Sequence, residues 1–275
     1  MMAELELLER AAGWLSEADG LLITAGAGVG VDSGLPDFRG NQGLWAAYPA
    51  LGDAGISFET IANPDAFRRD PALAWGFYGH RLALYRHVEP HAGFAVLRRW
   101  ANRMENGAFV FTSNVDGQFH KAGFPESAVA ECHGSIHHLQ CMTPCSTDIW
   151  SADGFAPDVD AHACRLQNEF PRCPHCGELA RPNILMFWDW GWLEERTDSQ
   201  RARLDGWLRG VKQLVVVELG AGTSLPTVRR FSERHGPRVI RINAREPQID
   251  AANGIGLRGR ALETLEALDR VLRGG

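Results

Sequence analysis

The chain has no long hydrophobic run and no excess of basic residues. None of its apolar stretches approaches the roughly 20 residues that a membrane-spanning helix needs. Lysine and arginine total 28 against 34 aspartates and glutamates, so the formal net charge is −6. Non-specific nucleic-acid binding needs a basic face that neutralises phosphates, so we expect no nucleic-acid partner. Because no apolar run is long enough to span a bilayer, we expect no membrane partner either.

The amino-terminal sequence lacks the features of a secretory signal. Glu4, Glu6 and Glu9 stand where a basic segment and an uninterrupted apolar stretch would be needed. We therefore predict a cytoplasmic protein, in which the six cysteines serve metal or thiol chemistry rather than disulfides. Hydrophobic residues make up 45% of the 275 positions, which excludes an intrinsically disordered chain.

Short apolar runs alternate with helical patterns along most of the chain. Runs typical of strands buried on both faces stand at residues 21–25, 109–112, 214–217 and 239–242. Apolar residues at helical spacing mark residues 3–18, 92–105 and 199–210. This alternation predicts an α/β fold with a doubly wound, parallel, Rossmann-like sheet.

Two stretches do not fit the alternation. Residues 40–90 are rich in aromatic residues and mostly helical in pattern, whereas residues 136–180 hold five cysteines and little periodicity. A segment that buries so little apolar surface needs another source of order, and a metal ion is the expected one. We predict a nucleotide-binding domain from residues 1–39, 91–135 and 181–275, with a helical insertion at 40–90 and a zinc-binding module at 136–180.

A glycine-rich loop follows the first predicted strand. Gly26, Ala27 and Gly28 begin it, and glycines allow backbone amides to approach a phosphate closely. The dinucleotide-binding template G-x-G-x-x-G requires glycine where Val31 stands, so the match is incomplete. The alternative is a glycine-rich turn without a ligand.

Four cysteines form two closely spaced pairs separated by 27 residues. They are Cys141, Cys145, Cys173 and Cys176. Four thiolates suit a closed tetrahedral zinc site of the structural kind. The first pair is one residue wider than the usual spacing, so Cys164 or His175 is open as a replacement ligand, and free thiols are the other alternative.

Six segments resemble the motifs of one family, in the family's order. They are GAGVGVDSGLPDFRG at 26–40, TSNVDG at 112–117, ECHGS at 131–135, RPN at 181–183, GTSL at 222–225 and the pair Ile242-Asn243. Together they resemble the sirtuins, NAD-dependent protein lysine deacylases, in a divergent bacterial-type form. The resemblance covers nearly the whole chain and implies NAD as co-substrate, a structural Zn²⁺ and an acyl-lysine protein or peptide as substrate.

The resemblance implies three catalytic residues. His133 would deprotonate a ribose hydroxyl after nicotinamide has left, which suits an imidazole that titrates near neutral pH. Asn114 would order water and ribose, and Asp116 would contact the nicotinamide carboxamide. Without the resemblance, His133 is more simply a structural histidine, and His137 and His138 compete with it.

The resemblance also implies the residues that bind the cofactor. They are Gly26, Ala27, Gly28, Asp37, Phe38, Arg39, Ser113, Asn114, Asp116, Gly222, Thr223, Ser224 and Asn243. Phe38 would cover the reacting sugar and exclude water. Asp37 and Arg39 would hold the cofactor loop, and Ser113 stands where the family usually has glutamine.

Two further pairs are expected to contact the acyl-lysine substrate. Tyr78 and Arg81 lie three apart on a predicted helix and resemble the pair of sirtuins that act on succinyl- or malonyl-lysine. An exposed helix arginine is the simpler alternative. Phe187 and Trp188 lie in a segment that, in the family, pairs with the substrate as an added strand. Trp188 occupies a position usually filled by glycine.

The predicted function is NAD-dependent removal of acyl groups from protein lysine, either acetyl or the acidic succinyl and malonyl groups. Such a transferase passes the acyl group to ADP-ribose and releases nicotinamide. The alternatives are an ADP-ribosyltransferase or NAD glycohydrolase on the same fold, and a non-catalytic NAD-sensing module. The sequence leaves the protein substrate and the oligomeric state open.

Overall fold

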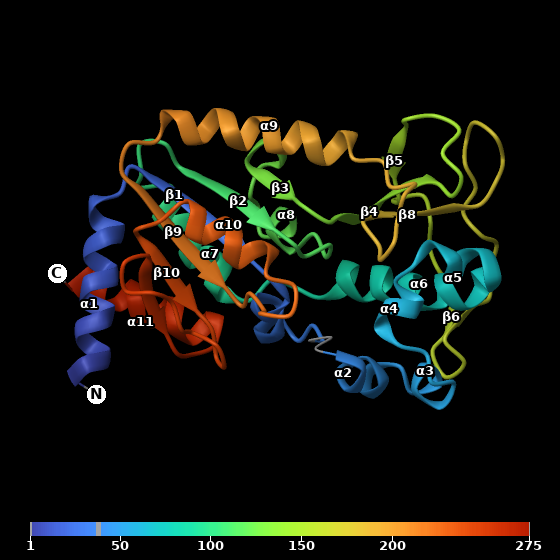
Figure 1. Ribbon diagram of the computed structural model, residues 1–275, viewed down its shortest axis with the longest axis horizontal. Helices are drawn as coiled ribbons and strands as arrows, with labels where there is room; N and C mark the ends of the chain where they lie inside the picture. The colour runs from blue at the N-terminus through green and yellow to red at the C-terminus, as the bar shows by residue number, and fades with distance from the viewer. Residues whose placement is uncertain (1, 37–39, 275) are drawn as a thin grey trace.

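A parallel sheet of six strands forms the larger lobe of the protein (Figure 1). The computed structural model describes residues 2–36 and 40–274. The strands are β1 (Gly20–Ala25), β2 (Ala108–Thr112), β3 (Val129–Glu131), β9 (Leu214–Leu219), β10 (Val239–Ile242) and β11 (Gly254–Leu257), in the order β11-β10-β9-β1-β2-β3. Every neighbouring pair is parallel, which confirms the predicted fold class.

Helices cover both faces of this sheet. On one face lie α1 (Met2–Glu17), α7 (Ala92–Ala101) and α11 (Ala261–Gly274), and on the other α9 (Glu195–Gly210) and α10 (Thr227–Arg234). Side chains alternate along β1, so Leu21 packs with Trp100 on the first face and Leu22 with Leu204 on the second. The uninterrupted apolar runs therefore reflect burial on both sides.

Two helix boundaries differ from the expected ones. Helix α7 ends at Ala101 instead of reaching residue 105, because the amides of Arg103 and Met104 turn back to carbonyls three residues earlier. Gly107, with φ of +62°, then turns the chain into β2. Helix α9 begins at Glu195 rather than at residue 199. Within residues 2–36 and 40–274, no helix combines the length and apolar character needed to cross a bilayer.

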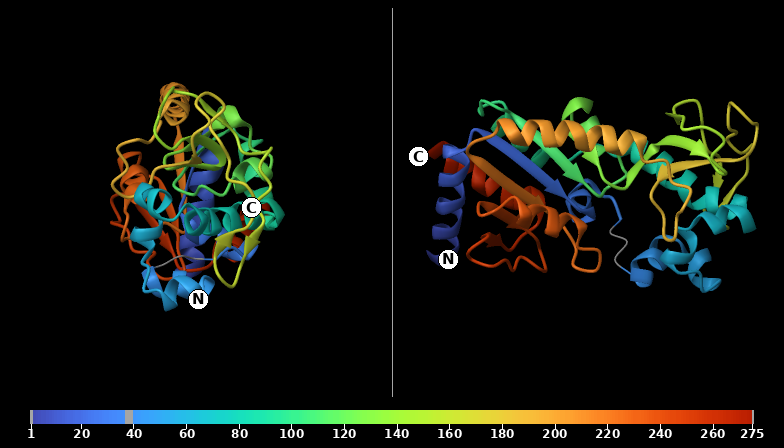
Figure 2. Two further views of the ribbon diagram at one scale, coloured as in Figure 1. Left: turned by 90° about the vertical axis from the view of Figure 1, so that its right-hand side faces the viewer. Right: turned by 45° about the horizontal axis from the view of Figure 1, so that its top comes forward.

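The smaller lobe combines helices with a short antiparallel sheet (Figures 1 and 2). Its helices are α2 (Gly40–Ala47), α3 (Pro49–Asp53), α4 (Phe58–Ile61), α5 (Pro64–Arg69) and α6 (Pro71–His87). Its sheet has the order β5-β4-β8, with β4 (Gly134–Cys141), β5 (Ile149–Ser151) and β8 (Ala180–Ile184). A separate hairpin pairs β6 (Val159–Asp160) with β7 (Arg165–Leu166).

The helices and the small sheet share one hydrophobic core. Phe77 and Leu82 of α6 pack in the same cluster as Ile136 of β4. The indole of Trp75 donates a hydrogen bond to the carbonyl of Ala180 across 3.0 Å. The predicted domain boundaries at 135/136 and 180/181 fall inside β4 and β8, and the division into domains stays a prediction.

Candidate active site

The carboxyl ends of the parallel strands bring most of the predicted cofactor residues to one edge of the sheet. Gly26 follows β1, Ser113 follows β2, and Gly222 lies just after β9. Asn243 directly follows β10. Open α/β sheets bind ligands at this edge, because the loops that follow the strands meet there. Asp37, Phe38 and Arg39 lie outside the described residues.

The glycine loop is packed directly against the loop that follows β9. A Cβ atom on Gly26 would lie 2.9 Å from the Cα atom of Ala221, which is closer than real Cβ contacts allow. The amide of Gly28 donates to the carbonyl of Gly220 across 3.1 Å. Only glycine at these positions lets the backbone after β1 approach the backbone after β9 this closely. The Gly28 amide already donates to a protein carbonyl, that of Gly220. A short 3-10 helix, Ala27–Ser33, continues the loop.

Asn114 and Asp116 occupy fixed, buried positions beyond β2. The side-chain amide of Asn114 donates to the carbonyl of Gly26 across 3.1 Å, and its backbone amide donates to the Thr112 hydroxyl across 3.0 Å. The carboxylate of Asp116 accepts from the amide of Gln118 across 2.9 Å. Burial raises the pKa of Asp116 to about 6. Both side chains are thus positioned before any ligand arrives.

His133 lies between β3 and β4, with its ring beside Ser113. Burial lowers the pKa of His133 below its ordinary value, and the neighbouring Ser113 backbone opposes this shift. A neutral imidazole has one ring nitrogen free of a proton, as a general base requires. Gly134 has φ of +74°, and a Cβ there would lie 2.1 Å from the Asn183 carbonyl oxygen.

The two competing histidines have different surroundings. A ring nitrogen of His137 is 3.0 Å from the carbonyl oxygen of Asp116, so this ring contacts the backbone of the Asp116 loop. Burial lowers the pKa of His138 to about 4. Cys132, expected to be a buried apolar residue, is 1% exposed, and burial raises the pKa of its thiol to about 12.

The loop after β9 is organised by two predicted cofactor residues, Asn243 and Thr223, and by two residues that the sequence did not single out, Arg229 and Glu246. Asn243 donates from its side chain to the Ala221 carbonyl across 2.9 Å, and the Thr223 hydroxyl donates to Glu246 across 2.7 Å. Arg229 donates to the same Ala221 carbonyl from two nitrogens. Thr223 and Ser224 are exposed at the tip of the loop. Arg229 has no motif around it that could have predicted this positioning role.

Tyr78 and Arg81 are both buried on α6, so the alternative of an exposed helix arginine is wrong. The Arg81 guanidinium lies over the rings of Tyr78 and Tyr85, at 5.8 and 5.4 Å from their centroids. It also donates to the Tyr85 hydroxyl across 3.0 Å. Burial raises the pKa of Tyr78 to about 12, so its hydroxyl remains a hydrogen-bond donor.

Phe187 and Trp188 lie in the segment between β8 and α9. The amide of Phe187 donates to the Ala62 carbonyl across 2.9 Å, which ties the segment to the helical insertion. Trp188 has φ of +52°. That conformation costs a residue with a side chain on the order of 1–3 kcal/mol, whereas glycine adopts it freely. Trp188 thus has a left-handed backbone conformation that favours glycine, the residue that the resemblance leads us to expect at this position.

The four predicted cysteine ligands form one cluster, in which all sulfur atoms lie within 4.8 Å of one another. The Cys141 and Cys176 sulfurs are 3.6 Å apart, and so are those of Cys145 and Cys173. A tetrahedral zinc–thiolate site with bonds of about 2.3 Å has sulfur separations of about 3.8 Å, so the donor set fits Zn²⁺.

The two alternative ligands lie outside this cluster. Cys164 is buried in the apolar core of the smaller lobe. His175 places a ring nitrogen 2.5 Å from a carboxylate oxygen of Asp148. The predicted set of four cysteines is therefore the one that could hold a structural zinc.

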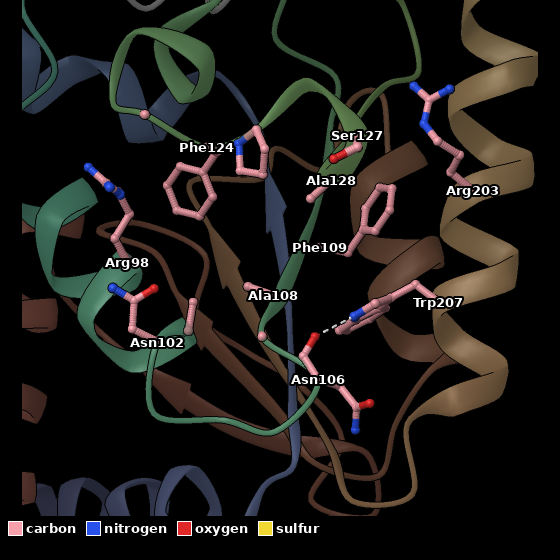
Figure 3. A pocket seen from close by; sticks show the side chains of 14 residues that line it. Arg98, Asn102, Asn106, Ala108, Phe109, Phe124, Ser127, Ala128, Arg203 and Trp207 are labelled. Atoms are coloured by element: carbon pink, nitrogen blue, oxygen red, sulfur yellow. Dashed lines mark hydrogen bonds between the residues drawn. The ribbon is translucent and has the colours of Figure 1, made fainter.

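Two cavities lie away from the glycine loop, one on the larger lobe and one where α6, β4 and β5 of the smaller lobe meet the larger lobe. One, of about 550 Å³, opens at the amino end of β2 between Arg98, Phe124 and Trp207 (Figure 3). The other, of about 690 Å³, includes Asp116 and His137 in its wall. Among the described residues, the first cavity is lined by none of the predicted site residues and the second by one of them, Asp116.

The fold and the strand-end site define an α/β protein of the Sir2 type. A family model described as the Sir2 family matches residues 26–203, and the chain belongs to this family. The predicted family membership is thereby confirmed.

Named relatives and solved structures agree with this assignment. The chain is 30% identical over 261 residues to an "NAD-dependent protein deacylase" of Pyrococcus furiosus, covering 94% of this chain and 95% of that protein. It is 31% identical over 250 residues to "NAD-dependent protein deacylase 2" of Pyrobaculum aerophilum, covering 90% and 88%. A Sir2 homologue in complex with NAD has a TM-score of 0.70 at 26% identity, covering 97% of this chain and 94% of that one. A Sir2 homologue mutant with 2′-O-acetyl ADP ribose has a TM-score of 0.67 at 29% identity, covering 98% and 96%.

Proposed function

We propose that this protein removes acyl groups from protein lysine in an NAD-dependent reaction that yields nicotinamide, O-acyl-ADP-ribose and free lysine. One observation carries the proposal: Asn114 and Asp116 follow β2 and His133 follows β3, and these two strands are parallel neighbours that end at the same edge of the sheet. The names of the relatives support the reaction, and the homologues bound to NAD and to 2′-O-acetyl ADP ribose support its co-substrate and product.

Each of the three residues has a distinct task in this reaction. NAD supplies the ribose carbon that receives the acyl oxygen when nicotinamide leaves. Asp116, as a carboxylate, accepts a hydrogen bond from the carboxamide, and Asn114 orients ribose and water. His133, which burial keeps neutral, then takes the proton of the ribose hydroxyl that attacks the acyl carbon.

The cysteine cluster would have a structural task. Cys141 ends β4, and Cys173 and Cys176 flank the turn that leads to β8, so Zn²⁺ would fasten two strands of the small sheet. The four thiolates fill the coordination sphere, which leaves no position for substrate. A cytoplasmic location and an acyl-lysine protein partner belong to the same proposal.

For the acyl group, we favour one that ends in a carboxylate. Arg81 is buried among aromatic rings. Burial raises the pKa of Asp116 and the charge of Arg81 partly opposes this rise, so the guanidinium lies within electrostatic range of Asp116. A charge-assisted hydrogen bond from Arg81 and one from the protonated Tyr78 would bind the distal carboxylate of succinyl- or malonyl-lysine.

Mass spectrometry of the products formed from NAD and a panel of acyl peptides tests both the deacylation reaction and the acyl preference. The panel contains acetyl-, propionyl-, succinyl- and longer-chain acyl-lysine. O-acyl-ADP-ribose in equal amount to free lysine supports deacylation. ADP-ribose formed without peptide would instead identify an NAD glycohydrolase, and ADP-ribosylated protein a transferase. Arg81→Met should reduce desuccinylation far more than deacetylation; equal losses would reject the acidic-acyl preference.

A further inference from the structure

The segment between β8 and α9 carries the most exposed aromatic side chains of the described chain. Trp190 is 97% exposed and Trp188 is 66% exposed, and Leu185 in the same segment is 39% exposed. Large apolar side chains gathered on one surface segment are typical of a binding surface rather than of a monomer's ordinary exterior.

This segment is rigidly anchored. The Arg181 guanidinium donates two hydrogen bonds of 2.8 Å to the Asp189 carboxylate, and both side chains are 1% exposed. The same carboxylate accepts from the Gly191 amide across 3.1 Å, and Gln140 donates to the Gly191 carbonyl across 2.7 Å. Because the backbone around both tryptophans is already fixed, a partner would lose little affinity in ordering it.

An aromatic row connects the segment to the helical insertion. The rings of Phe58 and Phe187 are 5.9 Å apart and nearly perpendicular. The rings of Phe187 and Trp188 are also 5.9 Å apart, tilted by 46°. Trp188 is thus the more exposed end of this row, and Trp190 follows it two residues later in the chain.

The segment begins at the proposed general base. The amide of Leu185 donates to the carbonyl of His133 across 3.0 Å. Since one residue spans at most about 3.6 Å, the Cα atom of Trp188 lies within about 11 Å of that of Leu185, and that of Trp190 within about 18 Å. The segment that bears both tryptophans therefore starts beside His133 and stays within the span of the few residues that flank an acyl-lysine at that site.

We propose that Trp188 and Trp190 select substrate polypeptides that carry an aromatic or long aliphatic side chain within about five residues of the acylated lysine. The inference rests on the proposed deacylation and adds to it a preference for sequence around the lysine. Tryptophan side chains are enriched among the residues that dominate binding energy, and both indoles here are exposed on an anchored backbone, where a partner can desolvate them. The occupant is the substrate's own chain, because the exposed surface is continuous with the residues that hold His133.

The test uses acyl-lysine peptides that are alanine-rich except for one tryptophan, leucine or serine placed in turn at each of five positions on either side of the lysine. At one or more positions, the wild-type protein should prefer the tryptophan and leucine peptides over the serine peptide by roughly ten-fold in kcat/KM, mainly through KM. Trp188→Gly, which suits the positive φ, and Trp190→Ser should each lower this ratio toward one.

Leu5→Ser is the matched control. Leu5 is 50% exposed and lies on α1, at the opposite end of the molecule from β8 (Figure 1). It should retain the wild-type ratio, and thermal unfolding of all variants shows whether they are folded. A wild-type ratio near one at every position, or a ratio that survives in both tryptophan variants, overturns the inference while deacylation stands.

A binding measurement separates this inference from the proposed function. In a His133→Ala background, fluorescence anisotropy of labelled acyl peptides in the presence of ADP-ribose, which has no nicotinamide to lose, should show the same preference for tryptophan and leucine without turnover. If the wild-type protein converts no acyl peptide and the His133→Ala variant binds none, both proposals fail. If substitution of Trp188 or Trp190 changes the oligomeric state measured by sedimentation but not peptide binding, these tryptophans join two copies of the chain. The proposed role in substrate selection is then wrong.

Discussion

The amide of Gly28 donates a hydrogen bond to the carbonyl of Gly220, and the two residues are so close that no side chain fits between them. A Cβ atom on Gly28 would lie 2.7 Å from the Cα atom of Gly220. The loops that follow β1 and β9 are therefore joined through their backbones at the edge where the cofactor residues gather.

Replacement of Gly28 by alanine should separate these loops. We expect Gly28→Ala to lower the free energy of unfolding by about 1–3 kcal/mol, because backbone atoms cannot yield as a flexible side chain would. NAD affinity should fall with it. Gly13→Ala is the control with the opposite expected sign, since Gly13 lies in α1 with open space around it and alanine favours a helix. Urea unfolding measures both; equal midpoints for Gly28→Ala and the wild type would contradict the prediction.

The raised pKa of Asp116, about 6, predicts a pH dependence of NAD use. Asp116 is protonated below about pH 6 and then cannot accept a hydrogen bond as a carboxylate, so kcat/KM for NAD should fall as the pH decreases through 6. The free energy of unfolding changes in the opposite direction. Because the pKa of Asp116 is higher in the folded state than in the unfolded state, its contribution to stability is lost as the pH rises from about 4 to 6. Asp116→Asn should abolish both transitions. An acid limb in the kcat/KM profile that survives in Asp116→Asn would assign it to another group, such as His133.

His133→Ala should separate the two halves of the reaction. Removal of a general base typically costs 10²–10⁴-fold in rate. Because His133 is assigned to the step after nicotinamide departure, the variant should still exchange labelled nicotinamide into NAD in the presence of acyl peptide. His162→Ala, at an exposed position on the smaller lobe, is the control and should keep both activities. Loss of exchange together with product formation would place His133 in an earlier step.

Loss of zinc should destabilise the smaller lobe. Cys176→Ser removes one thiolate of the four, so metal content measured by mass spectrometry should fall from one zinc per chain to well below one, and the thermal midpoint should fall as well. Cys132→Ala changes a buried cysteine outside the cluster and should keep one zinc per chain. An unchanged zinc content in Cys176→Ser would exclude this ligand set.

The sequence predicts those features that depend on a short stretch of residues, namely the buried strands and the polar residues that follow them. The four strand runs are visible because each is buried on both faces, as at β1, where Leu21 and Leu22 enter different cores. The catalytic candidates could also be placed, since Asn114 and Asp116 directly follow β2.

The remaining features depend on contacts between distant segments. Nothing near Trp75 indicates its hydrogen bond to Ala180, and no local pattern pairs Arg181 with Asp189. Helix α6 packs against strands that come much later in the chain, so the sequence of the helix alone did not distinguish a buried Arg81 from an exposed one. The exposure of Trp190 likewise depends on an anchor formed elsewhere.

The common core of the smaller lobe has a consequence during synthesis. The indole of Trp75 finds its acceptor 105 residues later, at Ala180. At roughly 5–20 residues per second, a ribosome needs on the order of 5–20 s to make that stretch. For that interval the aromatic face of α6 is without its partner strands, and a nascent chain of this protein is exposed to chaperones and to aggregation until translation passes β8.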